Sequence, residues 1–129
     1  MIAPQWLELE TVLAAHDETL AIAGGGQGLR DLGLLESALE RPKNRFHYEQ
    51  VEDLCDLAAT YAVGVAKNHP FVDGNKRSAF ICMATFLLIN GRRLVAGQDD
   101  ATVTFLAVAA GDIGIDDLSA WIRTNTREV

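Results

Sequence analysis

The stretch His69-Pro-Phe-Val-Asp-Gly-Asn-Lys-Arg77 decides how the rest of this chain is expected to fold. Its nine residues supply one imidazole, one carboxylate, one side-chain amide and two cations, and the strongly apolar residues 79–89 follow closely. Asp73-Gly74-Asn75 is typical turn chemistry. From about residue 75 to residue 90 the pattern is apolar on every face, broken mainly by Thr85. This pattern predicts a buried central helix that begins at the turn.

Helical periodicity on both sides of this segment predicts further helices around it. Asp31 can serve as an N-cap, Asn90-Gly91 is a good C-cap, and Asp99 or Asp100 can cap a later helix. In chain order we expect a helix from Pro4 to Ile22, a short one from Asp31 to Leu39 that Pro42 closes, an amphipathic one over residues 51–67, the central one over residues 75–90, one through residues 103–109, and a final short one over residues 115–122.

The remaining segments predict connectors rather than strands. The glycine cluster Gly24-Gly25-Gly26 with Gly28 lacks the lysine and the serine or threonine of a Walker loop, so we interpret it as a flexible connector. Residues 43–50 are polar and aromatic without helical periodicity, which predicts an exposed loop or a short hairpin. No run of strand length alternates between apolar and polar residues. We therefore expect an all-α protein, with one domain over residues 1–129 and a compact bundle of about six helices around a buried central helix.

Composition limits the class of protein and its partners. With 129 residues and 49% apolar content, the chain can bury a core of one domain. Its net charge of −7 argues against binding to the nucleic-acid backbone, because such binding rests on clustered cations. The longest apolar run is about eleven residues and the N-terminus has no signal-peptide pattern, so we expect a cytoplasmic protein that does not enter a membrane. Cys55 and Cys82 lie in apolar, helix-like runs, which predicts two reduced core residues.

The polar cluster at the start of the central helix has the parts of an anion site. A helix that begins at Gly74 or Asn75 presents unpaired N–H groups and the positive end of its dipole, and Gly74 lets a ligand approach the main chain. Lys76 and Arg77 oppose that dipole unless an anion sits there. A local rule broken in an otherwise consistent sequence indicates a functional site.

Two further side chains extend this site toward catalysis. Asp73 is a hard oxygen ligand that suits Mg²⁺, and His69 titrates near neutrality and could take a proton from an attacking hydroxyl. Together these are the parts needed for phosphoryl or nucleotidyl transfer. The alternative is a plain turn with a loop histidine and solvated cations. A transition-metal site would need more ligands than one histidine and one aspartate, and nothing in the sequence places His16 or His47 nearby.

Residues 69–77 resemble the signature of the Fic/Doc superfamily, which runs His-Pro-Phe, a variable residue, Asp or Glu, Gly-Asn, Gly or Lys, then Arg. Flanking segments resemble the death-on-curing (Doc) branch of that superfamily, so that the resemblance covers nearly the whole chain. These segments are Leu13-Ala-Ala-His16-Asp17, Gly28-Leu-Arg-Asp-Leu-Gly-Leu-Leu-Glu-Ser-Ala38 and Ala59-Thr60-Tyr61. The resemblance implies the all-α Fic/Doc fold.

Lys76 is the residue that separates the two branches. Fic proteins that transfer adenylyl groups usually carry glycine there, whereas Doc toxins carry lysine. Resemblance to Doc implies a toxin of a toxin–antitoxin pair that binds ATP and Mg²⁺ and transfers the γ-phosphate to a threonine of elongation factor Tu, which stops translation. The implied partners are a cognate antitoxin and that translation factor. Adenylyl transfer of the Fic type, or a catalytically weak protein that only binds nucleotide or a partner, stays open as an alternative.

The resemblance also implies a role for each residue of the motif, residues 69–77. His69 would be the general base, Asp73 would hold Mg²⁺ and help orient the acceptor, Gly74, Asn75 and Lys76 would form the anion cradle, and Arg77 would bind phosphate. Phe71 would anchor the loop in the core. Residues 45–48 are candidates for the flap that aligns a target segment in related proteins. Thr124-Asn-Thr-Arg-Glu128 matches only the first part of the inhibitory Ser/Thr-x-x-x-Glu-Gly/Asn segment of Fic enzymes, and we interpret this match as coincidence.

Overall fold

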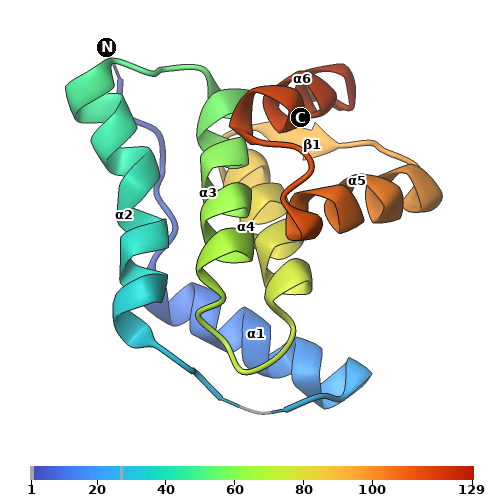
Figure 1. Cartoon of the computed structure of the whole chain (residues 1–129). Helices are drawn as coiled ribbons and strands as arrows, with labels where there is room; N and C mark the ends of the chain where they lie inside the picture. The colour runs from blue at the N-terminus through green and yellow to red at the C-terminus, as the bar shows by residue number, and fades with distance from the viewer. Residues whose placement is uncertain (1, 27) are drawn as a thin grey trace.

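Two antiparallel helices, α3 (Leu54–Asn68) and α4 (Asn75–Ile89), form the centre of the molecule. The computed structural model describes residues 2–26 and 28–129, with the backbone alone at Ala23. Helix α2 packs along one side of α3, and α6 packs along the other (Figure 1). Helix α1 lies across the end of the bundle at which the chain passes from α3 to α4 (Figure 1). Residues 69–74 of the motif therefore form the loop that connects the two central helices.

The outer elements complete the bundle. They are α1 (Leu9–Ala23), α2 (Leu32–Glu49), β1 (Arg92–Leu94), α5 (Gln98–Ala110), α6 (Ile115–Thr124) and β2 (Thr126–Glu128). The predicted all-α bundle of about six helices is confirmed in the described residues. Two short strands were not predicted: β1 and β2 pair antiparallel, with Leu94 opposite Thr126. Three-residue strands are too short to show alternation, so only the tertiary contact defines them.

Helix α2 is longer than the sequence predicts. Pro42 lies inside it rather than closing it, and residues 43–49 are helical instead of forming a loop or hairpin. An interior proline removes one helical hydrogen bond and costs about 3 kcal/mol. Packing offsets that cost, because Leu39, Pro42 and Phe46 all face the core from this helix. The helix ends at Gln50, which adopts a left-handed conformation.

The two central helices are buried to different degrees. Helix α3 has buried residues on nearly every face, because it is covered by α2, α4, α5 and α6, so the predicted amphipathic helix is in fact the more enclosed one. Gly64 of α3 brings that helix close to Ala38 of α2. Helix α4 is buried over most of its length but exposes Leu88 and Ile89 at its end. The two helices thus share the central position that the sequence predicted for α4 alone.

Several smaller expectations can be checked directly. Helix α1 begins at Leu9 instead of Pro4, and the extended residues before it carry Trp6, which packs between Phe46 and Phe86. Gly97 precedes α5, so Asp99 and Asp100 lie in its first turn rather than capping it. Both cysteines are buried and free, as predicted.

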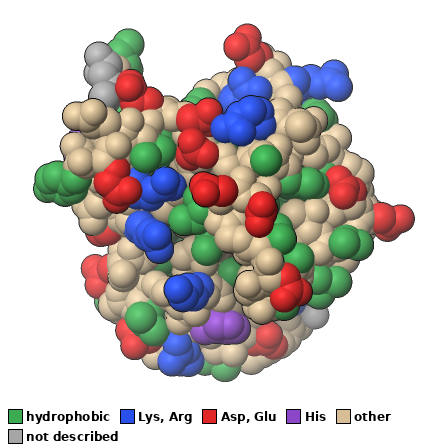
Figure 2. All heavy atoms as spheres, turned by 45° about the horizontal axis from the view of Figure 1, so that its top comes forward, with side chains coloured by type: hydrophobic (Ala, Val, Ile, Leu, Met, Phe, Trp, Pro, Cys, Tyr) green, Lys and Arg blue, Asp and Glu red, His purple; other side chains and the backbone are tan. Residues whose placement is uncertain are grey.

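The length of the helices and the charges on the surface can be described briefly. Among the described residues, no helix is long and apolar enough to cross a membrane. On the face shown in Figure 2, Lys and Arg side chains are interspersed with Asp and Glu side chains.

Candidate active site

The motif loop, residues 69–74, turns the chain from α3 into α4 with two left-handed residues. His69 ends α3 with φ 49°, and Gly74 precedes α4 with φ 78°. The left-handed region strains residues with a side chain, and it suits glycine at Gly74. Phe71 lies between them with 1% of its surface exposed, so it anchors the loop in the core, as predicted. His69, Val72 and Asp73 remain exposed.

The side chain of Asn75 closes this loop. Its Oδ1 accepts a hydrogen bond from the Phe71 N–H at 2.9 Å, and its Nδ2 donates to the Phe71 carbonyl at 2.9 Å. These two backbone partners fix the orientation of the amide. Nδ2 also lies 3.4 Å from His69 Nδ1, a long contact that favours, in a neutral imidazole, the tautomer with its proton on Nε2. The Asn75 side chain thus holds the loop, and its backbone N–H is what remains for an anion cradle.

A second segment, residues 28–31, runs antiparallel to the motif loop and is here called the strap. Leu29 pairs with Phe71 as an isolated β-bridge. The N–H groups of Arg30 and Asp31 both donate to the Pro70 carbonyl, at 2.7 and 3.0 Å. The Arg30 guanidinium donates to the carbonyls of His69 and Asn68, at 2.7 and 3.0 Å. The sequence analysis did not find the strap.

The glycines before the strap are also part of the site. The Gly26 N–H points toward Asp73 Oδ2 at 3.4 Å. A Cβ at Gly25 would lie 2.7 Å from the same oxygen, and one at Gly26 would lie 2.9 Å from Val72 Cγ1. The predicted flexible connector therefore lies against the motif loop, and its glycines allow that approach.

The start of α4 differs electrostatically from every other helix start among the described residues. Helices α2 and α3 are capped by Asp31 and Asp53, and α1, α5 and α6 carry acidic residues in their first turns. Helix α4 has neither feature, and its first turn carries Lys76 and Arg77. Its first hydrogen bond runs from the Ser78 N–H to the Gly74 carbonyl, so the N–H groups of residues 75–77 lie ahead of the helical ladder. This arrangement favours a bound anion.

A cleft of about 410 Å³ brings the predicted site residues together. It is lined by Ala66, His69, Val72, Asp73, Gly74, Asn75, Lys76, Arg77 and Ala109. A more apolar cleft of about 500 Å³, bounded by Phe80, Leu94 and Phe105 among others, shares Lys76 and Arg77 with it. Clefts of a few hundred Å³ accept molecules of nucleotide size.

The residues present fit one kind of metal ion. In the described part of the chain no three His, Cys, Asp or Glu side chains group around one point, which disfavours a metal held by protein ligands alone. The exposed Asp73 beside the start of α4 offers a single carboxylate. That donor suits Mg²⁺, which commonly binds through one or two carboxylates, waters and phosphate oxygens.

His16 is a neighbour of the motif that the sequence analysis missed. It is 2% exposed, and its ring stacks on Phe71 with centroids 3.7 Å apart. Burial lowers its pKa, the Arg77 charge lowers it further, and Asp17 and Asp73 oppose this shift. One signal could have found it, because His16 occupies the same helical stripe as the buried Val12 and Leu20.

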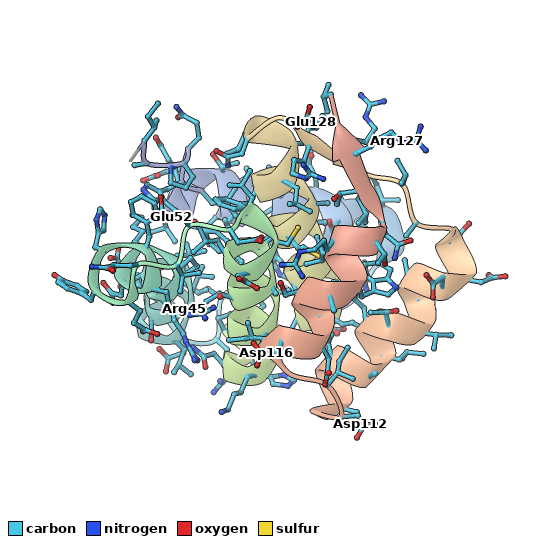
Figure 3. The ribbon with its side chains drawn as sticks, turned by 90° about the horizontal axis from the view of Figure 1, so that it is seen from above. Arg45, Glu52, Asp112, Asp116, Arg127 and Glu128 are labelled. Atoms are coloured by element: carbon cyan, nitrogen blue, oxygen red, sulfur yellow. The ribbon has the colours of Figure 1, made fainter. Side chains whose placement is uncertain are left out.

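Three other groups of residues discussed from the sequence lie away from the site. His47 packs against Trp6 and Phe46 in α2. Arg45 donates to Thr60 Oγ1 in the middle of α3 at 2.6 Å (Figure 3). Residues 45–48 are helical, and Phe46 contacts Trp6, which stacks on Phe86 near the end of α4, so these residues do not form a flap over the motif. Arg127 and Glu128 lie in β2, which pairs with the strand after α4 (Figure 3). The partial inhibitory match therefore lies at the opposite end of α4 from the motif.

Comparison with known proteins settles the family. A family model described as the Fic/DOC family matches residues 6–87, which contain the first three helices, the strap, the motif loop and nearly all of α4. The chain belongs to the Fic/Doc family. It is 33% identical over 114 residues to the protein kinase doc of Escherichia phage P1, covering 88% of this chain and 90% of that relative. It is 38% identical over 120 residues to the toxin Doc of Mycolicibacterium smegmatis, covering 90% of this chain and 89% of that relative.

Both Doc relatives extend beyond the segment matched by the family model. The model ends at residue 87, whereas each relative aligns with about nine tenths of this chain. Part of the region that contains β1, α5 and α6 is therefore shared with Doc proteins. This region supplies Leu94, Phe105 and Ala109 to the two clefts.

Proposed function

We propose that this Fic/Doc protein is a toxin of the Doc type and an ATP-dependent protein kinase, which transfers the γ-phosphate of ATP to a serine or threonine hydroxyl. The observation that carries the proposal is the gathering of all six predicted residues, His69, Asp73, Gly74, Asn75, Lys76 and Arg77, around one cleft at the cationic start of α4. The name of the phage P1 relative, a protein kinase, supports the same reaction class.

The phosphates of ATP would bind at the start of α4. The N–H groups of residues 75–77 point out of the helix, and Lys76 and Arg77 add two charges at the same place. Arg77 is half-buried, and its Nη1 is buried with no partner among the described residues. The guanidinium lines the cleft, and its planar shape suits phosphate oxygens. The neighbouring apolar cleft shares both cations and offers space for the rest of the nucleotide.

Asp73 would hold Mg²⁺ at the edge of the cleft. When bound, the ion would neutralise phosphate charge that develops during transfer. The Asp73 carboxylate is prepared for this position, because Oδ1 accepts from the Gly74 N–H at 2.7 Å and Oδ2 faces the Gly26 N–H. These contacts hold the carboxylate at the mouth of the cleft.

His69 would take the proton of the acceptor hydroxyl. The hydroxyl oxygen forms a bond to the γ-phosphorus, the bond from that phosphorus to the β–γ bridging oxygen breaks, ADP leaves, and the hydroxyl proton passes to the imidazole. The lone pair on Nδ1 faces the Asn75 amide at 3.4 Å, the outer limit of a hydrogen bond. An acceptor hydroxyl can displace so weak a contact.

Lys76 supports transfer of the γ-phosphoryl group over adenylyl transfer. Its side chain borders both clefts, so it fills space and adds charge where a glycine would leave only backbone. By family resemblance the acceptor is a threonine of elongation factor Tu, and a cognate antitoxin restrains the toxin. A translation factor as target accounts for toxicity, because its modification would stop protein synthesis.

The test uses ATP labelled at either the α or the γ position. The protein is incubated with Mg²⁺, elongation factor Tu and each labelled nucleotide, and label on the acceptor protein is measured. Transfer of γ label and not α label supports the kinase. Transfer of α label contradicts it and assigns adenylylation. If neither label is transferred although ATP binds, the proposed reaction on this target is wrong.

A further inference from the structure

His16 of α1 lies directly beneath the motif, on the side away from the cleft. Its ring is nearly parallel to Phe71, with an interplanar angle of 12° and centroids 3.7 Å apart. Its Nδ1 lies 3.0 Å from Ser78 Oγ in the first turn of α4. A Cβ added to Gly74 would lie 3.3 Å from His16 Cε1. One imidazole therefore contacts Phe71 and Gly74 of the motif and Ser78 directly after it.

The environment of His16 is unusual for a core residue. Its Nε2 is buried and has no partner among the described residues. It borders a cavity of about 20 Å³ between α1 and α4, which is too small for a substrate. The charged groups around it are Asp17 on its own helix, Arg77 on α4 and Asp73 on the loop. A phenyl ring of similar size would place no polar nitrogen here, so the imidazole adds hydrogen-bonding groups to an otherwise apolar position.

We infer that His16 is the positioning residue of the motif. Its ring holds Phe71 by stacking and Ser78 by a hydrogen bond, and thereby fixes the segment between them. That segment contains Asp73 and the N–H groups that would receive phosphate. His69 lies at the edge of this segment, because the Asn75 amide that bonds the Phe71 backbone has its Nδ2 3.4 Å from the His69 ring. A residue that acts this way changes the rate of transfer without touching substrate.

Two substitutions of His16 separate its two contacts. His16→Phe keeps a stacked ring and loses the bond to Ser78, whereas His16→Asn keeps an amide that can bond Ser78 and loses the ring. Ser78→Ala removes the same hydrogen bond from the other side and is the mildest change. His47→Phe is the matched control, because His47 is a histidine on α2 that packs on Trp6 and Phe46, away from the motif.

The kinetic test rests on the proposed kinase function. We expect kcat to fall about tenfold for His16→Phe and Ser78→Ala and about a hundredfold for His16→Asn, with KM for ATP nearly unchanged. The double variant His16→Phe with Ser78→Ala should be no slower than either single variant, since both remove one bond. Wild-type kcat in folded Ser78→Ala and His16→Phe, with only a lowered Tm, would assign His16 a purely structural role and overturn the inference.

A second readout needs no phosphotransfer. Hydrogen exchange of the amides of residues 71–78 is measured in wild type, Ser78→Ala and the His47→Phe control. We expect faster exchange in Ser78→Ala than in wild type or the control, confined to this segment. If the wild type transfers no phosphate, this result still supports the inference while the proposed function fails. Unchanged exchange in Ser78→Ala overturns the inference even in an active kinase.

Discussion

The two central helices begin in opposite ways. At the start of α3, Asp53 accepts hydrogen bonds from the N–H groups of Cys55 and Asp56, and Arg123 pairs with Asp53 at 3.0 Å. At the start of α4, no side chain caps the helix and Lys76 and Arg77 occupy the first turn. The two helices pack against each other in one bundle, so the difference lies in their first turns. The start of α3 is capped and ion-paired within the protein, whereas the start of α4 has the features expected of the proposed anion site.

The first turn of α4 departs from the capping and charge pattern that stabilises the other helix starts among the described residues. A ligand would add little stability at the first turn of α3, because the donors and charges there already have partners. The first turn of α4 keeps a helix dipole opposed by cations, which lowers stability in the free protein. Such a local conflict is typical of functional sites.

The largest expected effect comes from removing His69, the proposed general base. His69→Ala should lower phosphotransfer by about a thousandfold or more, because general base catalysis contributes about 10² to 10⁴ in rate and no second histidine borders the cleft in the described residues. Activity and ATP affinity are measured together. ATP binding and Tm should stay close to wild type, whereas loss of folding would show that His69 is structural.

The two arginines give a matched pair for the two helix starts. Arg77→Ala should weaken ATP binding about tenfold or more, because a phosphate contact is lost. Arg123→Ala should leave ATP binding unchanged and lower Tm, because it removes the partner of Asp53 and Asp56. Calorimetric titration and thermal unfolding measure both. Equal loss of ATP binding in the two variants would contradict the proposed division between the starts of α3 and α4.

A charge reversal in the first turn of α4 should weaken ATP binding and raise the stability of the free protein. Lys76→Glu places an anion in the first turn and should stabilise the free protein by about 0.5 kcal/mol, while it weakens ATP binding. Asp99→Lys makes the reverse change in the first turn of α5 and should destabilise by a similar amount without affecting ATP. Unfolding in urea checks both. Destabilisation by Lys76→Glu would show that the cations of α4 already have internal partners.

The smallest effect concerns pH. Burial raises the pKa of Asp53, but hydrogen bonds from Arg123 and from the Cys55 N–H outweigh it, so the pKa lies below its ordinary value of 3.8. A carboxyl with a lowered folded pKa contributes stability above its unfolded pKa and loses it as pH falls through the folded one. Wild type should therefore lose slightly more stability than Asp53→Asn as the pH falls below about 4. Identical acid unfolding of the two proteins would contradict this.

The sequence predicts the start of α4 well because the relevant signals are local. Turn residues, a cation pair and an apolar helix follow one another within a few residues, and the helix begins at Asn75 as expected. The ion pair at the start of α3 cannot be predicted from local sequence, because Arg123, the partner of Asp53, lies in α6.

The errors share a physical origin in tertiary contacts. Pro42 is a strong local stop signal, yet burial of Phe46 beyond it sustains α2. The strap forms because Arg30 and Leu29 pair with a segment about 40 residues away, which no periodicity reveals. His16 reaches the motif only because α1 crosses the end of α4. A short-range pattern thus shows where the site begins but not what supports it.

The most direct measurement maps ATP binding onto the two helix starts. Amide resonances of isotope-labelled protein are followed by NMR while ATP and Mg²⁺ are added. The account predicts that the amides of Asn75, Lys76 and Arg77 shift strongly and that those of Cys55 and Asp56 do not. Saturable binding that leaves the start of α4 unchanged would contradict the claim that this helix start is the phosphate site.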